Sequence, residues 1–362
     1  MAKFVIDARE YSTSTGRYIS VLIEYLEQID QSNDYIILLK PDDLQKCDLT
    51  NPRFVKFITP YKEFSLGEQL GFAWQLYKLK PDLVHFGMTQ QPILYHKRSV
   101  TTIHDLTTVR FNNPDKNPVV FFVKQQLYKF VVWYAAHKSK AVITDSQYVK
   151  KDVVDYTGIK PDKVTVAYLA ADKIKESSVP IKGLRDKKFI MYVGRPMPHK
   201  NLWRLIEAYD LLKPMYPDLY LVLAGKLDNN YIAIKQRVKK AAISGVIFAD
   251  FVSEGQLKWL YENTRVYVFP SLSEGFGLPG LEAMAHGAPV VSSNATCLPE
   301  VYGDAARYFD PLDKFAISQA IADVLSDTGL RKSLIANGYK CVAKYSWQHM
   351  AEQTLEVYKQ AL

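Results

Sequence analysis

Short apolar runs that alternate with longer segments of helical period constrain the fold of this chain more than any other feature. In the first half, the runs are Phe4–Asp7, Tyr35–Leu39, Leu83–Phe86, Ser99–His104 and Ala141–Asp145. They are short and rich in β-branched residues, as strands buried on both faces are. Strands separated by helical segments are typical of βαβ units around a parallel sheet. The first half is therefore predicted to be a doubly wound α/β domain.

A second series of the same kind begins after residue 188. Its predicted strands are Phe189–Gly194, Leu219–Gly225, Val246–Phe248, Val266–Pro270 and Ala288–Ser292. Between the two series, residues 173–188 are polar, contain a proline and a glycine, and have almost no periodic apolar face. We interpret them as an inter-domain linker. The sequence thus predicts one α/β domain over residues 1–172 and another over residues 189–345.

The composition narrows the class of protein. The chain has 362 residues, of which 48% are hydrophobic and 23% charged, so it can bury two cores and is not disordered throughout. Its three cysteines form no paired or zinc-binding spacing, which predicts a reducing compartment and no structural zinc. Because no apolar run of about 18 residues and no signal-like start are visible, we expect a soluble, cytoplasmic protein. The net charge of +8 suits nucleic acid, an anionic membrane or phosphate-bearing substrates alike.

The segment Ser271–Val291 joins a glycine-rich loop to a predicted helix that begins near Pro279. The glycines let backbone amides approach a ligand, and a helix N-terminus attracts phosphate. Glu274 on the loop and Glu282 on the expected first turn flank this arrangement and can accept hydrogen bonds from hydroxyl groups. The segment therefore predicts a site for a nucleotide-diphosphate sugar. A glycine-rich turn with one solvated and one capping glutamate is the simpler alternative.

This segment resembles the E-x7-E signature of retaining glycosyltransferases with the GT-B fold, in the large family four, group 1. The resemblance extends over nearly the whole chain and implies two Rossmann-like domains that face a central cleft. It implies that Glu274 contacts the transferred sugar and that Glu282 binds the ribose hydroxyls. It also implies that the terminal helix, residues 346–362, returns to the first domain.

Two cations follow the first strand of the second half. Arg195 comes directly after the glycine that ends the strand, and Lys200 lies at the start of the next predicted helix. An arginine fork and a mobile lysine charge both suit phosphate oxygens. The resemblance places them beside the diphosphate, where they offset the charge of the leaving nucleotide. Two solvated surface cations are the alternative.

Candidate residues of the first half follow the ends of predicted strands, where parallel sheets bind their ligands. The resemblance implies that His104 contacts the donor sugar, although a purely structural histidine fits as well. Asp105 is a candidate for orienting His104 or for acting on the acceptor. Residues 12–18 are similar to the family's glycine-bearing loop near the donor phosphates and the acceptor, with Gly16 and Arg17 as candidates. Ser and Thr replace the first glycines of this loop, and it lacks the GxGxxG pattern that a dinucleotide oxidoreductase would have after its first strand, so that class is disfavoured.

The turn after the third strand of the second half, Phe251-Val252, resembles the family's base-binding turn, and a plain buried phenylalanine is an equally good account. The predicted donor site comprises Arg195, Lys200, Phe251, Val252, Glu274, Gly275, Phe276, Gly277, Leu278 and Glu282. The predicted catalytic set comprises Glu274, His104, Arg195 and Lys200.

Residues 117–141 mix aromatic residues with lysines at helical spacing, which is typical of an interfacial helix. Family members often act on lipid-linked acceptors, so the resemblance implies peripheral contact with the inner face of the membrane through this segment. A core-packing helix with a basic outer face is the simpler interpretation. No module pattern supports binding of nucleic acid.

The resemblance implies transfer of a hexose to a glycan or lipid-linked acceptor with retention of anomeric configuration, and with no metal or other cofactor. Cations and a helix N-terminus would stabilise the departing charge in place of a metal. The motifs are similar to those of mannosyltransferases of polysaccharide and O-antigen pathways, which favours GDP-mannose as the donor. UDP-glucose or UDP-N-acetylglucosamine is the alternative donor. A nucleotide-sugar epimerase and a non-catalytic sugar-nucleotide binder are the alternatives from other functional classes.

Overall fold

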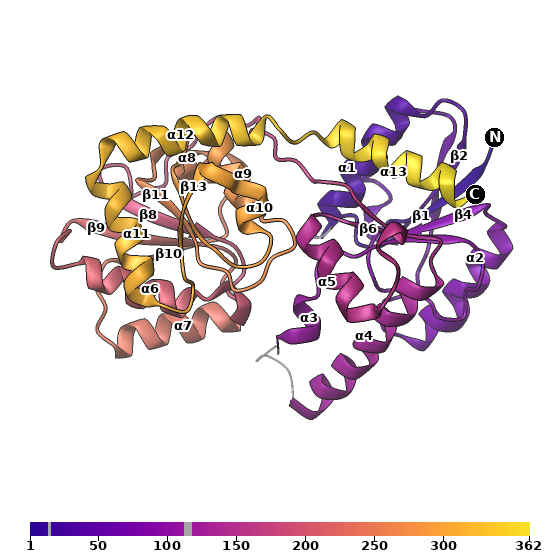
Figure 1. Cartoon of the computed structure of the whole chain (residues 1–362), viewed down its shortest axis with the longest axis horizontal. Coiled ribbons are helices and arrows are strands. Elements are labelled where there is room, and N and C mark those ends of the chain that lie inside the picture. Colours follow the sequence, from indigo (N-terminus) through magenta and orange to yellow (C-terminus); the bar gives the residue numbers. More distant parts are fainter. Residues whose placement is uncertain (14–15, 112–117) are drawn as a thin grey trace. The chain divides into compact units, whose positions relative to one another are not determined.

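The computed structural model describes residues 1–13, 16–111 and 118–362. The chain divides into two compact units (Figure 1). Unit 1 consists of Met1–Val109, Phe122–Leu169 and Ser346–Leu362, and unit 2 consists of Arg110–Phe121 and Ala170–Tyr345. Each unit is built on its own parallel sheet with helices packed against it. The predicted α/β class with two doubly wound halves is confirmed.

Within the described part of unit 1, seven parallel strands pair in the order β3-β2-β1-β4-β5-β6-β7. Their bounds are β1 (Lys3–Asp7), β2 (Asp34–Leu39), β3 (Phe54–Ile58), β4 (Leu83–Phe86), β5 (Ser99–Thr102), β6 (Ala141–Thr144) and β7 (Val164–Val166). The strand order reverses between β1 and β4, so the carboxyl ends of these two strands mark the place where doubly wound sheets bind ligands.

The helices that accompany this sheet are α1 (Gly16–Ile29), α2 (Ala73–Leu79), α3 (Thr107–Arg110), α4 (Pro118–Lys138), α5 (Gln147–Thr157) and α13 (Trp347–Ala361), with the short turns η1 (Pro41–Asp43), η2 (Glu68–Phe72) and η3 (Pro161–Lys163). The C-terminal helix α13 packs along α1. The hydroxyl of Ser346 accepts the backbone N–H of His349 and thereby caps its start. At its far end, buried Tyr358 bonds His85 on β4. The last 17 residues, 346–362, thus belong to unit 1.

In the described part of unit 2, six parallel strands pair in the order β10-β9-β8-β11-β12-β13. Their bounds are β8 (Lys188–Val193), β9 (Leu219–Ala224), β10 (Val246–Asp250), β11 (Val266–Phe269), β12 (Val290–Ser293) and β13 (Ala306–Phe309). The order reverses between β8 and β11, which places the ligand-binding position of this sheet at their carboxyl ends.

The helices of unit 2 are α6 (Leu202–Leu212), α7 (Asn229–Lys240), α8 (Glu254–Asn263), α9 (Leu278–Ala285), α10 (Leu298–Tyr302), α11 (Lys314–Ser326) and α12 (Thr328–Val342), with the short turns η4 (Pro198–Lys200) and η5 (Gly303–Ala305). The start of the linker is bound to these helices rather than free. The Lys258 ammonium on α8 donates to the carbonyls of Ile174 and Glu176. The N–H of Ile174 donates in turn to Nε2 of His286, directly after α9.

Candidate active site

Lys200 and Glu274 form an ion pair at the carboxyl ends of β8 and β11. Their Nζ and Oε1 atoms are 2.6 Å apart, and the side chains are 20% and 12% exposed. The backbone joins the two loops as well, because the N–H of Leu272 donates to the carbonyl of His199 at 2.7 Å. A cation and a carboxylate, 74 residues apart in the sequence, therefore meet at the strand-order reversal of unit 2.

The start of α9 requires glycine at two positions, the N-cap Gly277 and Gly280 in the first turn. Gly277 caps the helix with φ at +90°, a left-handed conformation that side chains disfavour. A Cβ at Gly277 or Gly280 would overlap the hydroxyl of Tyr302, which donates to the carbonyl of Gly277. Phe276 is buried and packs edge-on against Tyr345 at 5.3 Å. The loop therefore offers backbone rather than the Phe276 side chain to a ligand.

Glu282 lies one residue farther into α9 than the sequence predicts, just beyond the first turn. The helix begins at Leu278, one residue before the expected start, so Glu282 is its fifth residue and no acidic residue stands in the first turn. Its Oε2 accepts a hydrogen bond of 3.2 Å from the hydroxyl of Tyr261 on α8. Tyr261 also stacks on His286 at 5.6 Å. Tyr261, which sequence reasoning missed, thus fixes the position of the Glu282 carboxylate.

Arg195 lies apart from the Lys200–Glu274 pair. Its side chain is 69% exposed and pairs with Asp228 at an N–O distance of 3.8 Å. Such an exposed pair contributes little to stability. The guanidinium can therefore exchange Asp228 for an anionic ligand at small cost.

The turn after β10 exposes Phe251, whose side chain is 78% accessible. The alternative of a plain buried phenylalanine is therefore wrong. Asp250 builds this turn: it adopts φ of +57°, and its Oδ1 accepts the N–H groups of Leu227 and Phe251. The exposed ring and half-buried Val252 stand beyond the carboxyl end of the edge strand. No pattern in the sequence around Asp250 indicates that its carboxylate would hold this turn.

In unit 1, His104 lies two residues beyond the end of β5 and is held by two acceptors. Nδ1 is 2.7 Å from Oδ2 of Asp145, and Nε2 is 3.1 Å from the carbonyl oxygen of Gly87. Burial disfavours the charged ring, but the Asp145 carboxylate outweighs it, so the pKa of His104 is raised. Two acceptors on one ring favour an imidazolium that donates from both nitrogens.

Asp105 does not orient His104, contrary to one of its two expected roles. Its Oδ1 accepts the N–H of Thr107 at 2.7 Å at the start of α3, while Asp145 is the carboxylate that holds the imidazole. Asp145 ends a predicted strand, but its pairing with His104 spans 41 residues, so no local sequence pattern could predict it.

The expected glycine-bearing loop is described in part, because Ser14 and Thr15 lie outside the described residues. Gly16 begins α1, and a Cβ there would overlap the backbone carbonyl of Glu10. The guanidinium of Arg17 lies 5.9 Å from the ring centre of Trp347. Both candidate residues therefore lie in unit 1, next to the end of β1.

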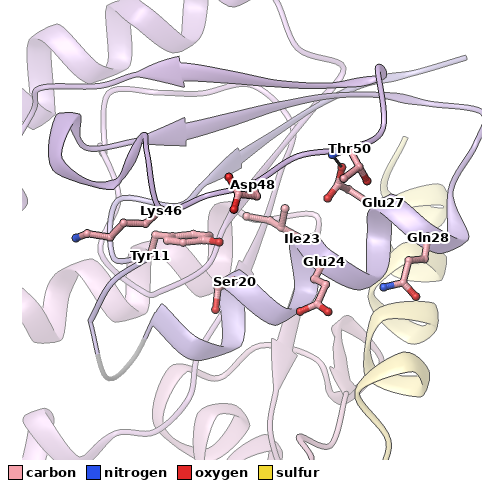
Figure 2. A pocket seen from close by; sticks show the side chains of 9 residues that line it. All are labelled: Tyr11, Ser20, Ile23, Glu24, Glu27, Gln28, Lys46, Asp48 and Thr50. Carbon is pink, nitrogen blue, oxygen red and sulfur yellow. Dashed lines mark hydrogen bonds between the residues drawn. The ribbon is translucent and has the colours of Figure 1, made fainter. Parts of the chain in front are cut away.

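A pocket of about 450 Å³ lies along α1 and the connection between β2 and β3 (Figure 2). Its lining residues are Tyr11, Ser20, Ile23, Glu24, Glu27, Gln28, Lys46, Asp48 and Thr50. Three carboxylates against one lysine make it unsuited to a diphosphate. Glu27 is also occupied, because Oε1 accepts the N–H groups of Thr50 and Asn51. This pocket is therefore distinct in chemistry from the Lys200–Glu274 site.

The segment expected to touch a membrane forms α4; its residue 117 lies outside the described residues. The inner face packs Val132 and Ala136 into the core of unit 1. Its outer face adds exposed apolar side chains to the exposed Lys124, so the core packing of the simpler interpretation is confirmed but the outer face is more apolar than expected. Lys138 points inward over the rings of Phe86 and Tyr95, and burial lowers its pKa to about 8. Across residues 1–13, 16–111 and 118–362, no helix is long and apolar enough to cross a membrane.

The two parallel-sheet units define the GT-B class of glycosyltransferases, and comparisons with known proteins agree. The family model described as "Glycosyl transferases group 1" matches residues 174–341, and that described as "Glycosyltransferase Family 4" matches residues 16–173. The chain belongs to this family of glycosyltransferases.

Its relatives include sugar transferases of bacterial surface polysaccharides. The chain is 32% identical over 303 residues to the "O-antigen chain mannosyltransferase B" of Escherichia coli. This match covers 79% of this chain and 76% of that protein. It is 34% identical over 238 residues to the "Serotype-specific mannosyltransferase WbdA" of Escherichia coli, a match that spans 62% of this chain and only 29% of that longer protein. The fold is similar to that of a sucrose-phosphate synthase from Thermosynechococcus elongatus, with a TM-score of 0.78, 19% identity and 99% of each chain covered.

Proposed function

We propose that this glycosyltransferase moves mannose from GDP-mannose to a hydroxyl group of a glycan or lipid-linked acceptor in polysaccharide or glycolipid synthesis. Transfer retains the anomeric configuration and uses no metal. The observation that carries the proposal is the Lys200–Glu274 pair beside the glycine loop at the strand-order reversal of unit 2. The mannosyltransferase relatives support the choice of sugar.

The proposed chemistry assigns a separate duty to each group. Arg195, Lys200 and the N-terminus of α9 hold the diphosphate and stabilise its charge as it leaves. Glu282 binds the ribose, and Glu274 contacts the transferred sugar. The bond from the anomeric carbon to the phosphate oxygen breaks, the bond to the acceptor oxygen forms on the same face, and the phosphate oxygen takes the acceptor's proton. No side chain then needs to be a strong base.

Unit 1 supplies the acceptor side and one donor contact in this proposal. His104 contacts the transferred sugar, with its ring fixed by Asp145 and the Gly87 carbonyl. Gly16, Arg17 and Asp105 serve the acceptor or the phosphates. The enzyme works in the cytoplasm, with a peripheral contact to the inner membrane face through residues 117–141. We propose no nucleic-acid partner.

The position of Glu282 predicts a role for Tyr261 in nucleotide binding. Replacing Tyr261 by Phe removes the hydroxyl that bonds Oε2, an interaction worth about 1 kcal/mol. We expect GDP to bind about fivefold more weakly, with turnover at saturating donor unchanged. Isothermal titration calorimetry with GDP measures the change.

Tyr209→Phe is the matched control for this variant. Its hydroxyl donates to the carbonyl of Leu219 at 2.8 Å, at the opposite end of the sheet from the site. This control should bind GDP as the unaltered protein does. Equal affinities in Tyr261→Phe and the control would contradict the role of Tyr261.

The function itself is tested by turnover with and without an acceptor. With GDP-mannose and a mannose-terminated oligosaccharide, we expect GDP release that requires the acceptor and persists in EDTA. Nuclear magnetic resonance of the product should show the anomeric configuration of the donor. Conversion of the donor without any acceptor would favour an epimerase, and donor binding without any turnover would favour a binding protein. Turnover with UDP-glucose or UDP-N-acetylglucosamine alone would replace the proposed donor.

A further inference from the structure

One face of α4 is an exposed apolar stripe. Its side chains are between 45% and 62% accessible: Phe122, Val123, Leu127, Phe130 and Trp133. They recur at helical spacing and therefore lie on the same side of the helix. Large apolar side chains rarely gather on the surface of a soluble domain unless the surface binds something.

A second exposed stripe runs along η2 and α2. Leu66, Leu70 and Trp74 recur every four residues and are 81%, 63% and 62% accessible. The opposite face of the same segment buries Phe72 and Leu76 in the core of unit 1. The segment Phe64–Lys78 is thus amphipathic, with a core-packed face and an apolar face without cover in the described unit.

The two stripes belong to one surface. The ring of Phe64 lies 6.3 Å from that of Tyr128 on α4. Tyr77 on α2 donates to the carbonyl of Leu94, and Tyr134 on α4 donates to the carbonyl of Ile93. Leu94 is itself 43% exposed between them. We name the exposed residues of Phe64–Lys78, Leu94 and the outer stripe of α4 the apolar surface (α2 and α4 in Figure 1).

The charges within and beside the apolar surface are mainly positive. The exposed lysines are Lys62, Lys78 and Lys124, and residues 118–138 contain no Asp or Glu. Of the acidic side chains in segment 62–78, Glu68 is fully buried and Glu63 is paired with Lys40. The ammonium of Lys78 lies 5.1 Å from the ring centre of Trp74, as in side chains that bury an apolar stem and keep the charge in water.

We propose that the apolar surface docks unit 1 onto an anionic lipid bilayer, with Phe64–Lys78 as a contact element equal to α4. Apolar side chains enter the boundary of the acyl chains while lysines meet anionic head groups. A second copy of the chain is a poorer occupant, because a two-fold contact would bring together two copies of the same mainly basic surface. This inference deepens the proposed peripheral contact of residues 117–141 and rests on it.

A buried ion network ties the docking segment to the end of β1. The carboxylate of Glu68 accepts Arg9 at 2.9 Å, the amide of Gln90 at 2.7 Å and the N–H of Phe64 at 3.0 Å. Arg9 also pairs with Asp7, the last residue of β1, at 2.7 Å. The chain then enters the loop that leads to Gly16 and Arg17. The network therefore links Phe64–Lys78 to the carboxyl end of β1, where the sheet of unit 1 is expected to bind its ligand.

The test is flotation of the full chain with vesicles of phosphatidylcholine alone or with added phosphatidylglycerol. We expect binding to the anionic vesicles only. Leu70→Ser/Trp74→Ser should lower the partition coefficient at least about tenfold, and Lys78→Glu/Lys124→Glu should weaken binding in a salt-dependent way. Met215→Ser/Phe315→Ser is the matched control, since these unit 2 residues are 63% and 64% exposed, and it should bind like the unaltered protein.

Absence of binding to anionic vesicles, or equal binding by the Leu70/Trp74 variant and the control, would overturn the proposal. So would a concentration-dependent dimer, seen by light scattering, that the Leu70/Trp74 variant abolishes. GDP-induced thermal stabilisation should be the same in all four proteins. If vesicles bind as expected but no nucleotide stabilises the chain, the proposed donor chemistry fails while the docking surface stands.

Discussion

Replacing Glu274 by Gln is expected to reduce turnover by about a hundredfold or more while donor affinity changes by less than about threefold. Glutamine keeps the size and the hydrogen-bonding oxygen but removes the charge that faces Lys200 at 2.6 Å. If Glu274 acts on the sugar as charge develops at the anomeric carbon, the loss falls on the transition state rather than on binding. The effect should therefore appear in kcat and not in the KM for the donor.

Steady-state kinetics with GDP-mannose and a mannose-terminated acceptor measures kcat and the KM for the donor separately, and calorimetry with GDP-mannose measures donor binding. Glu262→Gln is the matched control, because this carboxylate is exposed on α8. It should retain full turnover. Unaltered turnover in Glu274→Gln would remove Glu274 from the mechanism.

Removal of the Lys200 charge should affect both binding and turnover. We expect Lys200→Ala to lower kcat/KM by about 10²- to 10³-fold, since a positioned charge on a developing anion is worth about 2.7–4 kcal/mol. Donor affinity should fall as well, because in the proposed function the ammonium contacts the diphosphate in the ground state too. Kinetics and calorimetry on the same preparation separate the two effects.

The control for Lys200→Ala is Lys240→Ala, at the exposed C-terminal end of α7. It should behave like the unaltered protein. The melting temperature of Lys200→Ala without ligand should stay close to that of the control, because Asn201 still ties this loop to the carbonyls of Pro270 and Pro311. A loss of kcat/KM smaller than about threefold would show that Lys200 does not act on the donor.

The sequence predicts every inner strand of the two sheets and, among the described edge strands, only β10. β3, β7 and β13 were not predicted, and each lies at an edge of its sheet. In β3 four of five residues are exposed, and β7 has only three residues, so neither forms a buried apolar run. The predictable strands are therefore those whose residues form a continuous apolar run in the sequence.

Candidate site residues were predictable where a motif is local and not where partners are distant. The E-x7-E segment and the strand-end cations stand in local motifs that also carry the family resemblance, so they could be named. The groups that position them could not, because Asp145 meets His104 across 41 residues and Tyr261 meets Glu282 across 21. The helix of residues 118–138 was also predictable, but its apolar outer face depends on which side packs against the sheet.

A thermal-shift panel of nucleoside diphosphates and sugar nucleotides tests the central claim most directly, namely that unit 2 holds a nucleotide-diphosphate sugar. A ligand at a hundred times its Kd stabilises the folded state by about 2.7 kcal/mol. For a unit of this size that corresponds to roughly 5–10 °C in melting temperature. We predict such a shift with GDP-mannose, a similar one with GDP, and none with UDP-sugars. If no nucleotide raises the melting temperature at millimolar concentration, the assignment of the donor site is contradicted.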